Sequence, residues 1–72
     1  MIDVSLLKKT IREKGETIKS VSNALGMHIS TFYRHLASGG SKFTIEDVNL
    51  LCAFLSLSKK EMKSIFFNNK VA

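Results

Sequence analysis

The side chains best suited to chemistry lie in segment 28–37, which closely follows one glycine and precedes a glycine pair. On a helix, Phe32 and Leu36 would share one face, with His35 beside them. The opposite face would carry a different set of residues: Ile29, Ser30, Tyr33, Arg34 and Ala37. A branched alkyl group, a hydroxyl, a phenol and a guanidinium can contact thymine methyls, hydrogen-bond base edges and reach guanine or phosphate. This combination indicates a helix that could read double-stranded DNA.

The charge of the chain also points to an anionic partner. Eleven Lys and Arg residues oppose six Asp and Glu residues, which gives a formal net charge of +5. No Asp or Glu occurs between Glu16 and Glu46, so a polyanion could approach that stretch without repulsion. Nucleic acid is the partner class that this favours first, ahead of an acidic protein or a membrane surface. The alternative is that the charge serves solubility alone.

Other kinds of site find little support in the residues. Cys52 is the only cysteine, and its apolar neighbours predict a small core residue in a reducing cytoplasm. The two histidines lie seven residues apart without zinc-site spacing, so we expect no metal and no cofactor. No acid–base pair, nucleophile arrangement or phosphate loop is present, so we expect no catalytic residue, enzymatic activity or small-molecule substrate. Without a run of roughly 20 apolar residues or a signal-peptide pattern, we expect a cytoplasmic protein without membrane contact.

The elements that position segment 28–37 follow from the apolar spacing. Apolar residues recur every three to four positions, which predicts one all-α domain over residues 1–72. Helices are expected at about 4–14, 18–25, 29–37, 45–55 and 59–67. Asp3 and Thr17 are suitable N-caps, and Thr44 and Ser58 each begin a capping box.

The fourth of these helices is apolar nearly all round. Its main stripe is expected to comprise Ile45, Val48, Leu51, Cys52 and Leu55. Leu50, Ala53 and Phe54 would extend the apolar surface to the other side. A helix of this kind belongs in the centre of a bundle or at a subunit interface.

The second and third helices are joined through Gly26 and Met27. A short turn containing glycine between two short helices is typical of a helix-turn-helix. Glycine suits the turn because it adopts a positive φ without a Cβ clash. We expect Met27 to fill the space between the two helices, and Phe32 and Leu36 to bury the inner face of the third.

Further motifs extend along nearly the whole chain: Gly15-Glu16-Thr17, Val21, Leu25-Gly26-Met27, Ser30-Thr31-Phe32-Tyr33-Arg34, Leu55-Ser56-Leu57-Ser58 and Ile65-Phe66-Phe67. Together they resemble phage Cro and repressor proteins, and the likeness is strongest to small Cro-like proteins of Gram-positive phages and prophages. The resemblance implies a compact five-helix bundle of the lambda-repressor-like type. It also implies a transcriptional regulator, commonly a homodimer, that binds operator DNA in a bacterial host and is nucleoid-associated when bound. The third helix would enter the major groove, with base contacts from Ile29, Ser30, Tyr33 and Arg34.

Phosphate contacts are expected around the third helix. Many members of this family carry Gln at the first position of the second helix, where it touches phosphate. This chain has Ile18 there, so Thr17 or Lys19 would supply that contact. His28 replaces a common Ser, so we expect a weaker helix cap at that position. The remaining phosphate contacts are expected from His28, Thr31, Arg34 and Lys42. The first helix carries four cations that either solubilise it or reach the DNA backbone: Lys8, Lys9, Arg12 and Lys14.

A second kind of function stays open beside DNA binding. Ile18 and Ile29 are apolar where polar readers of DNA are common, as in a protein-binding adaptor or antirepressor that keeps the fold without specific DNA binding. The acid-free stretch favours DNA, because an adaptor does not need it. Phe54 and Phe67 exceed what so small a core needs, and we expect them at a dimer interface.

Overall fold

The computed structural model describes residues 2–67, which fold into five helices and contain no strand. The helices are α1 (Val4–Glu13), α2 (Ile18–Ala24), α3 (Ile29–Ala37), α4 (Ile45–Phe54) and α5 (Lys59–Phe66). The predicted all-α class is therefore confirmed. Every helix begins at the expected residue. All except α3 end one residue before the expected end, because the final residue is a C-cap.

Each helix begins at a polar N-cap whose side chain accepts a hydrogen bond from a backbone N–H. The capping boxes expected at Thr44 and Ser58 are both present. A third box, which the sequence analysis did not predict, joins Thr17 to Ser20 at the start of α2. Local polar residues thus fix where the helices begin.

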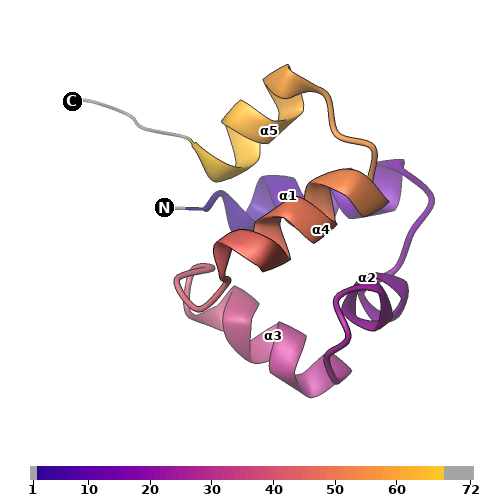
Figure 1. Ribbon diagram of the computed structural model, residues 1–72, viewed down its shortest axis with the longest axis vertical. Coiled ribbons are helices and arrows are strands. Elements are labelled where there is room, and N and C mark those ends of the chain that lie inside the picture. The colour runs from indigo at the N-terminus through magenta and orange to yellow at the C-terminus, as the bar shows by residue number, and fades with distance from the viewer. Residues whose placement is uncertain (1, 68–72) are drawn as a thin grey trace.

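The core draws apolar side chains from all five helices. Its buried members are Leu7, Ile11, Val21, Phe32, Leu36, Leu51, Leu55, Ile65 and Phe66. Helix α2 contacts α1, α3 and α4, and α1 also contacts α5. Figure 1 shows α5 and α3 at opposite ends of the molecule, with α1 and α4 between them.

Helix α4 differs from the expectation at its first residue. Ile45 was expected on the inward stripe, but 83 % of its surface is exposed. At 100° per residue, Ile45 lies roughly 70° from the mean direction of the four inward residues, at the edge of the stripe. Leu50 and Phe54 face outward, at 40 % and 39 % exposure. The helix is therefore buried on one side only.

The loop between α3 and α4 closes against the inner side of α3. Phe43 packs on Phe32 with ring centroids 5.4 Å apart, and its ring meets His35 edge-on at 5.0 Å. Gly40 has a φ of +82°, and a Cβ there would lie 2.6 Å from Ile2 Cδ1. The loop therefore needs glycine at the position where it passes the N-terminal segment.

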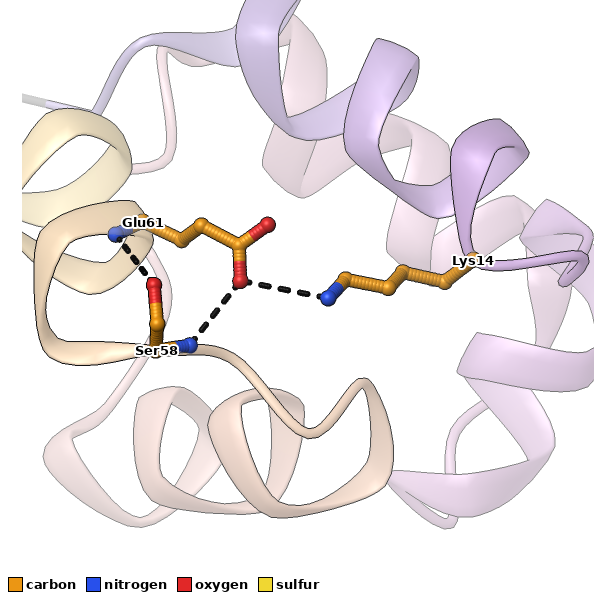
Figure 2. A network of polar contacts seen from close by, with 3 residues as sticks. All are labelled: Lys14, Ser58 and Glu61. Carbon is orange, nitrogen blue, oxygen red and sulfur yellow. Dashed lines mark hydrogen bonds and ion pairs between the residues drawn. The ribbon is translucent and has the colours of Figure 1, made fainter.

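One ion pair links the end of α1 to the start of α5 (Figure 2). Lys14 Nζ lies 3.1 Å from Glu61 Oε1, and the same carboxylate oxygen accepts a 2.9 Å hydrogen bond from the Ser58 backbone N–H. The Ser58 bond, reinforced by Lys14, lowers the pKa of the Glu61 carboxyl. No other ion pair occurs within residues 2–67. This contact adds a polar connection to the packing of α1 on α5.

Replacing Glu61 with Gln should make the stability of the fold less dependent on pH. A carboxyl whose pKa is lower in the folded chain stabilises the fold above its unfolded pKa of about 4.3. That stabilisation is lost as the pH falls through the lower folded pKa. Gln keeps an oxygen for the Ser58 N–H but removes the charge. We therefore expect Glu61→Gln to be less stable than the wild type near neutral pH and to approach it at an acid pH below the unfolded pKa.

Chemical denaturation at the two pH values measures this difference. Glu13→Gln is the matched control, since Glu13 forms no ion pair in the described part of the chain. A loss of stability for Glu61→Gln that is equal at both pH values would contradict a role for the charge.

Candidate nucleic-acid interface

Helices α2 and α3 are joined by the four-residue turn 25–28 and pack against each other. Gly26 adopts a φ of +70°, as the turn requires. The Met27 N–H donates to the Ser22 carbonyl at 3.0 Å, and the Met27 side chain packs against the core. Ser22 is itself buried, and its hydroxyl donates to the Lys19 carbonyl at 2.9 Å. The turn is therefore short, hydrogen-bonded and packed, which fixes α3 relative to α2.

The inner face of α3 agrees with the sequence-based expectation. Phe32 is fully buried and Leu36 is 5 % exposed. His35 is half-buried beside Phe43, and its Nδ1 is buried without a hydrogen-bond partner in the described residues. His35 is thus a packing residue, as expected, rather than part of the exposed surface.

The outer face of α3 is left open. Ser30, Tyr33 and Arg34 are exposed, and half of the Tyr33 surface is accessible. Ile29 is only half-buried at the first residue of the helix. The four side chains expected to contact bases therefore all keep accessible surface, although Ile29 keeps less than the others.

His28 caps α3 through its imidazole ring. Its Nδ1 accepts the Ser30 backbone N–H at 3.1 Å and lies 2.8 Å from the Ser30 hydroxyl oxygen. A ring nitrogen thus replaces the side-chain oxygen of a usual cap. These bonds assign the neutral ring's proton to Nε2, which leaves that N–H as a donor to an incoming group. The cap therefore forms in the structure, and its strength relative to a Ser cap stays a prediction.

The Arg34 side chain forms a hydrogen bond with Thr31 on the same helix. One guanidinium nitrogen donates to the Thr31 hydroxyl oxygen at 3.2 Å. The remaining N–H donors of the guanidinium stay free for another acceptor. Thr31, expected to contact phosphate, is half-buried and holds Arg34 in place.

The other residues expected to contact phosphate lie around α3. Thr17 and Lys19 are exposed at the start of α2, and Thr17 Oγ1 accepts the Ser20 N–H at 3.0 Å. Lys42 is exposed in the turn after α3. It follows the C-terminal end of that helix, whereas His28 precedes the N-terminal end. The two lysines therefore lie on separate elements, α2 and the turn after α3, rather than at one point.

An open groove joins α3 to α1, which sequence reasoning did not foresee. It measures about 350 Å³ and is lined by Lys8, Ile11, Arg12, Glu16, Thr17, Ile18 and Tyr33. Lys8 and Arg12 are four residues apart and so share one side of α1. That spacing was visible in the sequence, but only the fold shows that this side of α1 lines the same groove as Tyr33 of α3.

The start of α2 and of α3 share an electrostatic property. The first turns of both helices contain no acidic residue. Their caps are formed by neutral hydroxyls and by the His28 ring, whereas Asp47 and Glu61 complete the capping boxes of α4 and α5. The capping groups themselves are therefore uncharged, although the Glu16 carboxylate accepts a hydrogen bond from the Ser20 hydroxyl at the start of α2.

The two aromatic residues expected at a dimer interface are both exposed. Phe67 is 62 % exposed and lines a shallow apolar groove with Ile45, Phe43, Val48 and Phe66. Phe54 does not line this groove. The structure therefore groups Phe67 with Ile45, a residue that the sequence analysis had assigned to the core.

The cap formed by His28 can be tested by substitution. His28→Ala should lower the free energy of unfolding by about 1 kcal/mol, because the Ser30 N–H loses its acceptor. His28→Asn should restore most of that loss, since Asn is among the strongest N-caps. Denaturant unfolding of the three proteins measures the effect. Equal stability of His28→Ala and the wild type would show that the ring does not cap α3.

Other classes of site are not found in the part of the chain that the structure describes. No group of three or more His, Cys, Asp or Glu side chains there could hold a metal ion. No helix within residues 2–67 has the length and apolar character needed to cross a membrane. Compared with known proteins, the chain matches no protein-family model, no curated protein and no solved structure.

Proposed function

We propose that the protein is a sequence-specific regulator of transcription that binds double-stranded DNA, in the manner of Cro-like phage or prophage repressors. The observation that carries this proposal is the outer face of α3. It exposes a hydroxyl, a phenol and a guanidinium on a helix that Phe32 and Leu36 hold firmly in the core. Groups of this kind read base edges in the major groove.

Charge supports the same surface. The stretch from Thr17 to Ile45 contains no acidic residue and includes Lys19, Arg34 and Lys42. A phosphate backbone approaching α3 could then contact these cations and the exposed His28 ring. Their neutralisation of phosphates would release counterions and supply the salt-dependent part of the affinity. Ile29, Ser30, Tyr33 and Arg34 would then supply the discrimination among base sequences.

A dimer on DNA completes the proposal. Two copies would read half-sites about 34 Å apart on one face of the duplex. The apolar groove that contains Phe67 and Ile45 is the surface best suited to contact between copies, because it exposes large apolar side chains. Repression would follow when the bound dimer occupies a promoter.

The second candidate function is a protein-binding adaptor or antirepressor. The exposure of Ile45, Leu50, Phe54 and Phe67 favours it, because such side chains are suited to protein contacts. An adaptor of this kind has no use for an acid-free outer face on α3. DNA binding therefore separates the two candidates.

Selection of bound duplexes from a random pool, repeated at rising salt, tests the proposed function. We expect a palindrome to be enriched, with half-sites separated by about one helical turn. The enriched duplex should bind more tightly than a scrambled duplex of the same length at every salt concentration. Failure to enrich any sequence, with no difference between the two duplexes, would favour the adaptor.

Arg34→Ala should weaken binding to both duplexes and flatten the dependence of affinity on salt. The slope of log K against log salt should fall in magnitude by about 0.9, the value for one lost phosphate contact. Lys63→Ala is the matched control, since Lys63 is exposed on α5, at the other end of the molecule (Figure 1). Anisotropy titrations over a salt series provide the measurement. An unchanged slope would contradict the phosphate contact, and a loss confined to one base pair would assign Arg34 to that base.

A further inference from the structure

The groove between α1 and α3 gathers polar side chains from three helical regions. Lys8 and Arg12 come from α1, Thr17 caps α2, and Tyr33 comes from the outer face of α3. Ile11 and Ile18 complete the apolar part of the lining. The groove therefore continues the exposed surface of α3 onto α1.

The four cations of the α1 region are not equivalent. Lys14 is paired with Glu61 and so belongs to the contact with α5. Lys9 is exposed but does not line the groove. Lys8 and Arg12 line it, and neither has a carboxylate within ion-pair distance among residues 2–67. Two unpaired cations thus line the same groove as Tyr33.

One acidic residue, Glu16, also lines the groove. Its Oε1 accepts a hydrogen bond from the Ser20 hydroxyl, with 2.8 Å between the two oxygens, and this bond holds the carboxylate toward α2. The lining therefore carries two positive charges and one negative charge. Its net charge remains positive, although Glu16 reduces the attraction for an anion.

We propose that Lys8 and Arg12 bind a phosphodiester group of the same duplex that α3 reads, with the Tyr33 hydroxyl as a third donor. This proposal rests on the proposed function and extends the DNA-binding surface onto α1. A guanidinium can donate two parallel hydrogen bonds to phosphate oxygens, and a lysine ammonium adds a point charge. Ile18 has no side-chain donor at the start of α2, so the donors in this groove come mainly from α1 and α3.

The proposal also changes the expected role of Tyr33. A phenol that contacts phosphate contributes equally on every sequence, whereas a base contact discriminates among sequences. Base reading would then rest on Ile29, Ser30 and Arg34, with Tyr33 at the edge of the reading surface.

Two double variants of equal net charge test the groove. Lys8→Ala with Arg12→Ala removes both groove cations, and Lys9→Ala with Lys63→Ala removes two exposed cations outside it. Affinity is measured by anisotropy over a potassium chloride series, on the enriched duplex and on a scrambled duplex of the same length. The groove variant should reduce the magnitude of the salt slope by about 0.9, the value for one lost phosphate contact, on both duplexes. The control variant should change the slope much less. Equal slopes for the two double variants would overturn the proposal.

Two single variants sharpen the result. Tyr33→Phe keeps the ring and should weaken binding several-fold on both duplexes, with the same preferred sequence. A changed preferred sequence would overturn the phosphate role of Tyr33. Arg12→Lys should retain most of the salt slope, and thermal melting by circular dichroism checks that every variant is folded.

The outcomes separate this inference from the proposed function. If the wild type binds neither duplex, the proposed function fails and the groove proposal fails with it. If binding depends on Arg34 but not on Lys8 and Arg12, only the groove proposal fails.

Discussion

The burial of Phe32 is the interaction on which the candidate surface depends. Helix α3 has nine residues, too few to be stable alone in water. Phe32 is fully buried near its middle, packs against Phe43 and fixes which side of the helix faces outward. A helix anchored in this way can expose Ser30, Tyr33 and Arg34 without using their side chains to fill the core. The exposed groups thus depend on a contact made on the opposite side of the same helix.

Polar contacts in the first two turns of α3 complement this anchor, and some overlap with the exposed face. His28 caps the first turn through Ser30, and Thr31 holds the Arg34 guanidinium. The hydroxyl groups of Ser30 and Thr31 are therefore partly engaged within the chain. An arrangement of this kind reduces the conformational freedom that Arg34 would lose on binding a ligand. Residues that stabilise the start of α3 thus also lie on or beside its exposed face.

Sequence reasoning was most successful for features that depend on residues close together in the chain. The helix starts follow from polar caps and apolar spacing, so Thr44 and Ser58 could be assigned before the structure was known. The inner face of α3 followed from the same spacing. Ile45 was misassigned because a residue at the edge of an apolar stripe is buried only if a neighbouring element covers it. The contact of Phe43 with Phe32, and the groove between Lys8 and Tyr33, depend on which elements meet, and helical periodicity does not contain that information.

The positions of the acidic residues determine the charge around the candidate surface more than the net charge of the chain does. Asp3, Asp47 and Glu61 cap or complete the caps of α1, α4 and α5. Carboxylates are favourable there, because they compensate the positive end of the helix dipole. At α2 and α3 the same task falls to neutral groups, Ser20 with Thr17 and the ring of His28. At α2 a carboxylate still lies close to the cap, because Glu16 accepts a hydrogen bond from Ser20 at 2.8 Å, whereas the first turn of α3 has no acidic residue. A carboxylate at the start of α3 would repel a phosphate, so a cap formed by the His28 ring keeps negative charge away from the start of this helix.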